Sequence, residues 1–419
     1  MNRLIIVGNG FDLAHGLPTS YANFVDFIWQ NFNLHETNEL FNKLFIVDYD
    51  LFGRTNVIGN YNNLKQIIEK AFSRNSDFII STTKATGYSV VYRKNFNLGN
   101  DKIIFEFKNK FFYLINSNRI NNWVQIEDLY YKELLTLVKN LDNNRMIKDI
   151  NQLNREFEEI KLLLNFYLKT EIEDTFDFNS NISQLSEIAK ILEFKFQELK
   201  RNSMSSYFHE FTGIDKKMLI NYDNMIKQSK EQYEPIEFEN LFVDFNYTST
   251  VGSYVRALNQ SPNKYGKNYH IQIHGNLTDL ENPINFGFGD EMDDHYKIIE
   301  NNNNNAYLEN MKSFMYLNNS NYKDLLNWIR EKDYQILIFG HSCGLSDRTL
   351  LNTVFENENC KSIKIFYHKR NNGPDNFRNL SMDISRHFNK KPQMRDKVVN
   401  KSLCQELPQN IRFQKKIIK

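Results

Sequence analysis

The chain has little cysteine, glycine and proline for its length, with 3, 16 and 7 of them among 419 residues. Cys343, Cys360 and Cys404 form no C-x-x-C pair, which excludes a four-thiolate zinc site and fits a reducing compartment. No apolar run approaches the roughly 20 residues that a membrane-spanning helix needs. Leu4–Val7 is too short for a signal peptide. We therefore expect a soluble, cytoplasmic protein without a membrane partner.

An excess of charge of one sign is also missing, because 52 Lys and Arg residues nearly balance 51 Asp and Glu residues. We therefore expect no global basic field that would attract nucleic acid. For the same reason we consider a nuclease function less well supported than the functions discussed in the following paragraphs. Aromatic residues, by contrast, make up 14% of the chain, which favours a globular protein over a disordered one.

The start of the chain is its most informative segment. The apolar run Leu4–Val7 is followed by Gly8-Asn9-Gly10, a pattern typical of a buried strand that leads into a glycine turn. Glycine permits both the bend and a close approach of backbone N–H groups to a ligand phosphate. Leu13 stands where the dehydrogenase fingerprint has its third glycine. The segment predicts a ligand-binding turn, with a purely structural strand–turn–helix as the alternative.

Further short apolar runs have the character of buried parallel strands. They are Leu241–Phe245, His270–Ile273, Gln335–Phe339 and Ser362–Tyr367. Together with Leu4–Val7 they predict one doubly wound parallel sheet, with helices such as Tyr322–Glu331 and Arg348–Glu356 between the strands. The predicted fold class is α/β, with a Rossmann-like core and a large, mostly helical insertion.

A long interruption separates the first strand from the second. Alternating runs at Tyr88–Tyr92 and Ile103–Phe107 predict a small hairpin, and apolar residues recur at helix spacing from Asn122 to about Gln232. We divide the chain into a Rossmann-like core at 1–49 and 236–400, a mixed α/β segment at 50–121, a helical insertion at 122–235, and a C-terminal tail at 401–419. The insertion is interpreted as a lid or an assembly surface, which leaves a homo-oligomer open.

Two loops stand out in the second half of the chain. Gly287–Asp294 combines glycines with carboxylates but lacks the ligand spacing of hard-cation loops, so we interpret it as a solvated acidic turn and expect no metal. Asn301–Asn305 is a pure asparagine run, which we interpret as a mobile surface loop.

Polar residues gather where the predicted strands end. Asn246 follows the second strand, His274 ends the third, and Gly340-His341-Ser342 follows the fourth. Taken singly, a strand-end histidine is usually a hydrogen-bonded core residue, and an asparagine is usually a turn former or helix cap. One parallel sheet delivers all these ends to one crevice. We therefore predict that they surround a single cavity together with the turn at Gly8–Gly10.

Four motifs in this order resemble the bacteriophage abortive-infection AbiH family: GNGFDLAHGLPT at 8–19, FNYT at 245–248, IHG at 273–275, and GHSCGLSD at 340–347. Trp123 followed by Ile126-Glu127-Asp128 is similar to an internal motif of that family. The resemblance covers most of the chain, to about residue 370. It implies a role in antiphage defence by abortive infection, with a phage-derived trigger as a partner.

That family in turn resembles the sirtuin-like NAD-binding proteins, which implies NAD as a substrate. The implied ligand-binding set is Gly8, Asn9, Gly10, Phe11, Asp12, Gly16, Leu17, Pro18, Thr19, Gly275, Gly340, His341, Ser342 and Asp347. Asn246 matches the asparagine near the nicotinamide ribose and His274 the active-site histidine, so the resemblance implies that both are catalytic. It also implies that the Gly8–Gly10 amides hold the pyrophosphate and that Ser342 with Asp347 holds the adenosine ribose.

The chain departs from the sirtuin pattern in three ways. Thr248 stands where that pattern usually has aspartate, while Asn9 and Asp12 replace a small alanine and a serine or threonine. The four-cysteine zinc module is absent, so protein deacetylation is not implied. What the resemblance implies is NAD binding and cleavage of the nicotinamide–ribose bond, with His274 as the general base.

Two other functions stay open. The segment 340–344 matches the G-x-S-x-G elbow of α/β-hydrolases, in which Ser342 would be the nucleophile. Its candidate base and orienting acid are His368 or His387 and Asp347 or Asp375. This interpretation gives no role to Asn246 and His274. The other function is non-catalytic, with a nucleotide signal bound in the pocket while the insertion senses a phage component.

Overall fold

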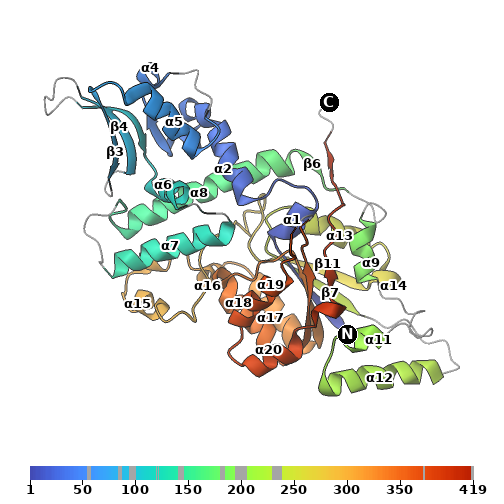
Figure 1. Ribbon diagram of the computed structural model, residues 1–419. Helices are drawn as coiled ribbons and strands as arrows, with labels where there is room; N and C mark the ends of the chain where they lie inside the picture. The colour runs from blue at the N-terminus through green and yellow to red at the C-terminus, as the bar shows by residue number, and fades with distance from the viewer. Residues whose placement is uncertain are drawn as a thin grey trace.

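The computed structural model describes residues 1–53, 58–83, 87–93, 101–118, 120, 122–139, 146–179, 185–193, 205–228, 238–370 and 373–416. Its largest sheet has six strands in the order β11-β10-β9-β1-β7-β8, and all neighbouring strands are parallel (Figure 1). They are β1 (Asn2–Val7), β7 (Glu239–Asp244), β8 (Lys267–Gln272), β9 (Tyr334–Phe339), β10 (Cys360–Tyr367) and β11 (Gln405–Glu406). The five predicted strands all lie in this sheet.

The winding of this sheet locates its ligand-binding edge. β1 is central; the next two strands along the chain, β7 and β8, lie on one side of it, and β9, β10 and β11 lie on the other. This is the doubly wound order 3-2-1-4-5-6, whose switch point falls between β1 and β9. The predicted α/β class with a Rossmann-like core is confirmed.

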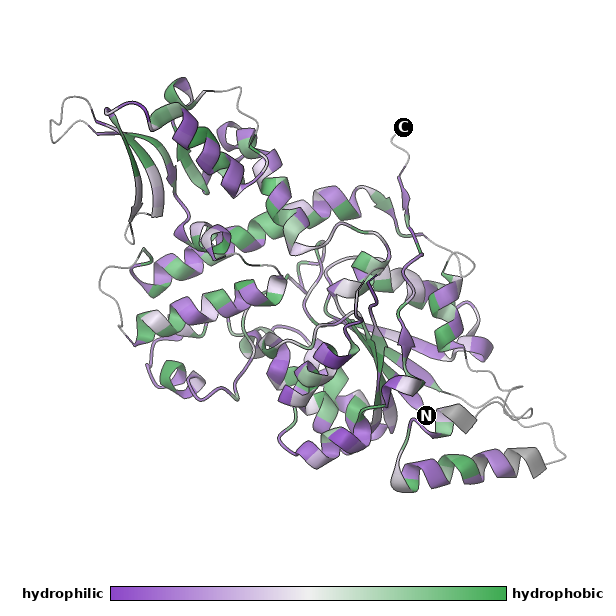
Figure 2. Ribbon diagram, viewed as in Figure 1, coloured by the Kyte–Doolittle hydropathy of each residue, from purple (hydrophilic) through white to green (hydrophobic). Residues whose placement is uncertain are grey.

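Both faces of the sheet are buried, as parallel sheets require. Ile5 and Val7 pack into one hydrophobic core with Phe339, whereas Leu4 and Ile6 pack into a second core on the opposite face. The edge strand β8 carries more polar residues, whereas the strands at the centre of the sheet, β1 and β9, are mostly hydrophobic along their length (Figure 2). This arrangement explains why they appear in the sequence as short continuous apolar runs.

Helices connect and cover the strands. In the core they are α1 (Asn9–Ala14), α13 (Thr250–Leu258), α14 (Pro262–Tyr265), α15 (Tyr296–Glu300), η4 (Asn305–Tyr307), α16 (Lys312–Met315), α17 (Asn321–Glu331), η5 (Leu345–Asp347), α18 (Arg348–Glu356), α19 (Phe377–Arg386), α20 (Lys391–Lys397) and η6 (Lys401–Leu403). The predicted helices at 322–331 and 348–356 correspond to α17 and α18.

A second sheet lies within the interruption between β1 and β7, and its order is β2-β5-β4-β3. Its strands are β2 (Phe45–Val47), β3 (Phe78–Thr83), β4 (Gly87–Tyr92) and β5 (Lys102–Phe107). The predicted hairpin is confirmed, because β4 and β5 pair antiparallel. The flanking helices are α2 (Tyr21–Gln30), η1 (Phe32–Glu36), α3 (Glu39–Asn42), α4 (Tyr49–Phe52) and α5 (Tyr61–Phe72). β3, β4 and α5 lie at the far end of the molecule from the large sheet (Figure 1).

The described part of the chain between this sheet and β7 is mostly helical. Its helices are α6 (Lys110–Ser117), α7 (Trp123–Val138), α8 (Ile150–Leu168), the π-helical η3 (Lys169–Glu173), α9 (Ser186–Leu192), α11 (Ser205–Phe208) and α12 (Gly213–Gln228). After η3 the short strand β6 (Phe176–Asp177) pairs antiparallel with β12 (Gln414–Lys415) near the C-terminus. Among the described helices, none is both long and apolar enough to cross a membrane.

The acidic segment at 287–294 differs from the solvated turn that we expected. Phe288 is buried and stacks on Tyr131 of α7, with ring centroids 3.9 Å apart. Asp290 is also buried, and its carboxylate pairs with Arg348 over 3.2 Å. The first half of the segment is therefore packed into the protein by aromatic and ionic contacts. The asparagine run at 301–305, by contrast, is exposed.

Candidate functional site

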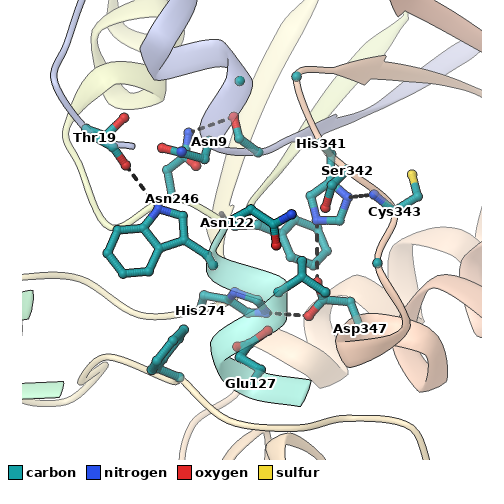
Figure 3. Close-up of a pocket in the computed structure, with 18 of the residues that line it drawn as sticks. Asn9, Thr19, Asn122, Glu127, Asn246, His274, His341, Ser342, Cys343 and Asp347 are labelled. Carbon is teal, nitrogen blue, oxygen red and sulfur yellow. Dashed lines mark hydrogen bonds and ion pairs between the residues drawn. The ribbon is translucent and has the colours of Figure 1, made fainter. Parts of the chain in front are cut away.

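A cavity of about 500 Å³ opens where β1, β7, β8 and β9 end. Of the residues predicted from the sequence, it is lined by Gly8, Asn9, Gly10, Asp12, Thr19, Asn246, His274, Gly340, His341, Ser342 and Asp347 (Figure 3). The predicted convergence of the strand ends on one cavity is confirmed. The turns after β1 and β9 border the switch point, which is where doubly wound sheets bind their ligands.

The glycine turn is packed against the loop that follows β9. The N–H of Gly8 donates to the carbonyl of Phe339 over 3.1 Å, and the N–H of Gly10 donates to the carbonyl of Gly340 over 2.8 Å. A Cβ atom on Gly10 would lie 2.7 Å from that same Gly340 oxygen. Position 10 therefore requires glycine because two backbone segments meet there. Both N–H groups are used within the protein, which corrects the expectation that they cradle a pyrophosphate.

Five residues of the predicted ligand-binding set lie outside the cavity lining: Phe11, Gly16, Leu17, Pro18 and Gly275. Phe11 is 1% exposed and stacks on Phe339 in the core. Gly275 has a φ of 94°, and a Cβ atom there would lie 2.1 Å from the carbonyl oxygen of Pro283. The carbonyl of Pro18 accepts a hydrogen bond from the Tyr167 hydroxyl. These positions shape the loops around the cavity, which corrects the expectation of direct ligand contact.

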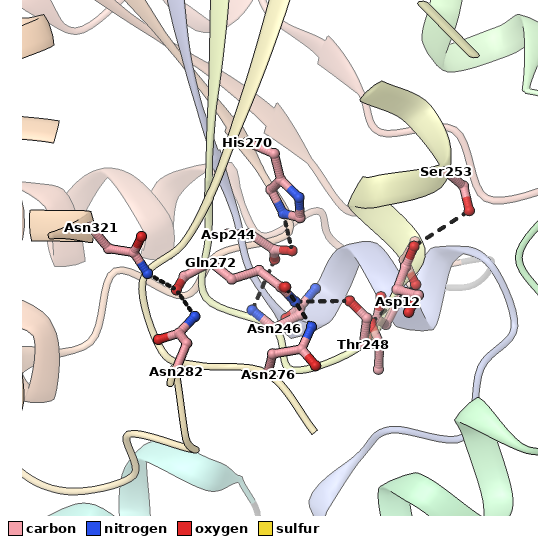
Figure 4. A network of polar contacts seen from close by, with 12 residues as sticks. Asp12, Asp244, Asn246, Thr248, Ser253, His270, Gln272, Asn276, Asn282 and Asn321 are labelled. Atoms are coloured by element: carbon pink, nitrogen blue, oxygen red, sulfur yellow. Dashed lines mark hydrogen bonds and ion pairs between the residues drawn. The ribbon is translucent and has the colours of Figure 1, made fainter. Parts of the chain in front are cut away.

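Asn246 is held in place by β1 and β7. Its main-chain N–H donates to Asp244 Oδ1 over 3.0 Å, and its side-chain Nδ2 donates to the carbonyl of Gly8 over 3.2 Å. Asp244 is itself fixed by His270, whose Nε2 lies 3.0 Å from Asp244 Oδ2 (Figure 4). Within the described part of the chain, the side-chain oxygen of Asn246 has no hydrogen-bond partner. It is therefore free to accept a hydrogen bond from a ligand or water.

His274 ends the third predicted strand and lies beside Asp347 (Figure 3). Its Nε2 is 3.1 Å from Asp347 Oδ1, so this nitrogen carries the proton and donates to the carboxylate. Among the residues that the structure describes, Nδ1 has no hydrogen-bond partner and is the nitrogen available to accept a proton. Burial lowers the pKa of His274 and Lys312 lowers it further, while Asp347 opposes both effects. The imidazole is therefore neutral at neutral pH.

His341 is the second imidazole in the cavity, and both of its nitrogens face the protein. Nδ1 accepts a hydrogen bond from the main-chain N–H of Cys343 over 3.0 Å, and Nε2 faces Asp347 Oδ2 at 3.7 Å. Burial lowers the pKa of His341 to about 4. Of the two histidines, His274 has the nitrogen suited to act as a base.

Lys312 and Glu127 line the cavity beside Asp347, and neither was predicted as a site residue from the sequence. Lys312 is 1% exposed, and its Nζ contacts Asp347 Oδ1 at 2.7 Å and Glu127 Oε1 at 2.9 Å. Burial alone would lower the pKa of Lys312, but the two carboxylates raise it, so the ammonium stays charged. Burial alone would raise the pKa of Asp347, but Lys312 and His274 hold it well below its usual value.

The contacts that a serine nucleophile needs are missing among the described residues. The Ser342 hydroxyl has no hydrogen bond to an imidazole there, and His387 directs its Nε2 to a backbone carbonyl at 2.8 Å. His368 is exposed, and Asp375 pairs with a surface lysine over 2.6 Å. Ser342 therefore lines the cavity without a triad, which corrects the hydrolase interpretation.

The insertion supplies an apolar wall of the cavity that sequence reasoning did not assign. Its lining side chains are Trp123 and Val124 of α7 and Leu164 and Leu168 of α8, together with Phe286 of the core. The Trp123 indole N–H donates to the carbonyl of Thr19 over 3.0 Å, which fixes the start of α7 against the loop after α1. The cavity thus has a polar side built from strand ends and an apolar side built largely from the insertion.

The winding order and the cavity at its switch point define a Rossmann-like α/β protein whose cavity lies between core and insertion. A comparison with protein families matches residues 4–369 to the family described as bacteriophage abortive infection AbiH. The chain belongs to this family, and membership supports a role in abortive infection of phage-challenged cells. The resemblance to that family is thereby confirmed. A search of individual curated proteins finds no match.

Proposed function

We propose that this protein binds NAD in the cavity and hydrolyses its nicotinamide–ribose bond, and that loss of NAD arrests the infected cell. The observation that carries the proposal is the position of Asn246 and His274 on one cavity with the two switch-point turns. Dinucleotides bind at this place in doubly wound sheets. The volume of about 500 Å³ falls within the range of small-molecule and cofactor sites.

In the proposed reaction, the bond between ribose C1′ and the nicotinamide nitrogen breaks. Nicotinamide leaves as a neutral molecule with the electron pair of that bond, and C1′ becomes oxocarbenium-like. A water oxygen then bonds to C1′, while Nδ1 of His274 accepts a proton from this water. The products are nicotinamide, ADP-ribose and a proton, and a general base typically contributes about 10²–10⁴-fold.

Neighbouring groups support the base and the sugar. Asp347 accepts the Nε2–H of His274 and thereby stabilises the imidazolium that forms, a role that replaces its predicted contact with the adenosine ribose. The free oxygen of Asn246 orients the water or a ribose hydroxyl. Ser342 keeps its assignment to the adenosine ribose. The first turn of α7 opens onto the cavity and offers N–H groups to the pyrophosphate in place of the glycine amides.

The experiment follows cellular NAD after phage challenge in bacteria that carry the wild type or the His274→Ala variant. Cells with the wild type should lose NAD and fail to release phage, whereas the variant should preserve NAD and lose protection. His368→Ala removes an exposed histidine outside the cavity and should behave as wild type. Protection by the wild type at unchanged NAD would contradict the proposal and favour nucleotide sensing without catalysis.

A further inference from the structure

A row of buried charged groups connects the insertion to His274. Glu127 of α7 meets Lys312 over 2.9 Å, and Lys312 meets Asp347 Oδ1 over 2.7 Å. The same Asp347 oxygen lies 3.1 Å from His274 Nε2. None of the four side chains is more than 7% exposed, so solvent screens their interactions only weakly.

We propose, on the basis of the function proposed above, that Glu127 is a positioning residue. Its ionised carboxylate strengthens His274 as a base through the shared ammonium of Lys312. Glu127 does not touch the reacting atoms in this assignment; it acts through Lys312 and Asp347.

The net charge of the buried cluster depends on whether Glu127 is ionised. With Glu127 neutral, Lys312 and Asp347 cancel, and an imidazolium on His274 would leave one uncompensated positive charge. With Glu127 ionised, the cluster carries one negative charge, and proton uptake by His274 makes it neutral. An ionised Glu127 therefore favours the step in which His274 accepts a proton.

Glu127 is suited to make this change near neutral pH. Burial raises its pKa to about 7, although Lys312 acts in the opposite direction. The other groups that face the cluster are Asp128, Tyr247, Tyr316, His341 and the main-chain N–H of Gly287. Burial raises the pKa of both tyrosines and lowers that of His341 to about 4, so these three stay neutral from pH 6 to pH 8.5.

The kinetic test compares nicotinamide release by the wild type and Glu127→Gln between pH 6 and pH 8.5. Gln is nearly isosteric and mimics the protonated acid, so the two rates should agree within about twofold at pH 6. Above pH 8 the wild type should be up to about tenfold faster. Each pKa unit by which the ionised Glu127 strengthens His274 as a base corresponds to at most about tenfold in rate. Asp128→Asn removes the adjacent carboxylate of the same helix. This variant should keep the wild-type rise in the rate of nicotinamide release near pH 7. A rate ratio that does not change with pH would assign Glu127 a purely structural role and overturn the proposal.

A second measurement does not depend on NAD turnover. In protein labelled with ¹⁵N-histidine, the His274 signal, assigned by its loss in His274→Ala, should shift with an inflection near pH 7 in the wild type. Glu127→Gln should lose that inflection, and Asp128→Asn should keep it. An inflection without any nicotinamide release would reject the proposed reaction and retain the electrostatic link. Identical titration curves in the wild type and Glu127→Gln would reject the link itself.

Discussion

Thr248 donates a hydrogen bond from Oγ1 to Asp12 Oδ2 over 2.8 Å, and both side chains are buried (Figure 4). These are two of the positions at which the chain departs from the sirtuin pattern, which has the hydroxyl on the first turn and the carboxylate after the later strand. The two departures meet in one contact, in which the hydroxyl and the carboxylate have exchanged places. The contact fixes the loop after β7 against α1 at the edge of the cavity.

The buried Asp12 should make stability depend on pH. Burial raises the pKa of Asp12 to about 7, far above the value near 3.9 of an unfolded chain. The folded protein therefore keeps a proton that the unfolded chain has lost, and stability falls as the pH rises toward 7. Relative to the wild type, Asp12→Asn should gain about 2 kcal/mol in free energy of unfolding between pH 5 and pH 8.

Urea denaturation of both proteins at the two pH values measures this difference. Asn retains an oxygen that accepts the Thr248 hydroxyl, so the variant should fold. An equal difference between variant and wild type at pH 5 and pH 8 would mean that Asp12 has an ordinary pKa.

The contact between the two switch-point turns should make Gly10→Ala destabilising. A Cβ atom would lie 2.7 Å from a backbone oxygen, which cannot rotate away, and overpacking of this kind costs about 1–3 kcal/mol. Gly59 is the matched control, because a Cβ atom there meets no atom of the described residues within 4 Å. Thermal unfolding should show a clear loss for Gly10→Ala and little change for Gly59→Ala. Equal effects of the two changes would refute the assigned role of Gly10.

The ammonium of Lys312 should be needed because it separates two buried carboxylates. Lys312→Met leaves Glu127 and Asp347 without their shared cation and should cost about 3 kcal/mol at pH 8. Adding Glu127→Gln removes one of the two charges and should recover part of this loss. Urea unfolding of the two single variants and the double variant measures the coupling. Strict additivity would show that the two residues do not interact.

Ser342 should not react as a serine nucleophile. Because its hydroxyl has no imidazole partner among the described residues, a fluorophosphonate probe should leave the purified wild type unlabelled. Intact-protein mass spectrometry detects the adduct. Labelling of the wild type that disappears in Ser342→Ala would restore the hydrolase interpretation.

The sequence was sufficient to predict the sheet and the cavity because parallel strands are buried on both faces. Runs such as Leu4–Val7 therefore stand out, and their polar ends must meet at one edge. The hydrogen bond that the Gly10 N–H donates could not be predicted, because its acceptor, the Gly340 carbonyl, is distant in sequence.

The row of charged residues in the cavity wall was harder to predict. Glu127 left a signal, because it shares a helix face with the buried Tyr130 and Leu134 at spacings of three and seven residues. A carboxylate on an apolar helix face needs a buried partner. Lys312 left no such signal, since it follows no strand and only the tertiary fold brings it to Asp347.

The central claim is that His274 acts as the base for cleavage of NAD, and release of nicotinamide from NAD by the purified protein tests it most directly. The wild type, His274→Ala and the control His368→Ala are each incubated with NAD, with and without an extract of phage-infected cells as a source of trigger. We predict that the wild type and His368→Ala release nicotinamide and ADP-ribose in equal amounts, and that His274→Ala is slower by at least about 100-fold. Recovery of intact NAD from the wild type under both conditions, or equal release by His274→Ala, would contradict the account.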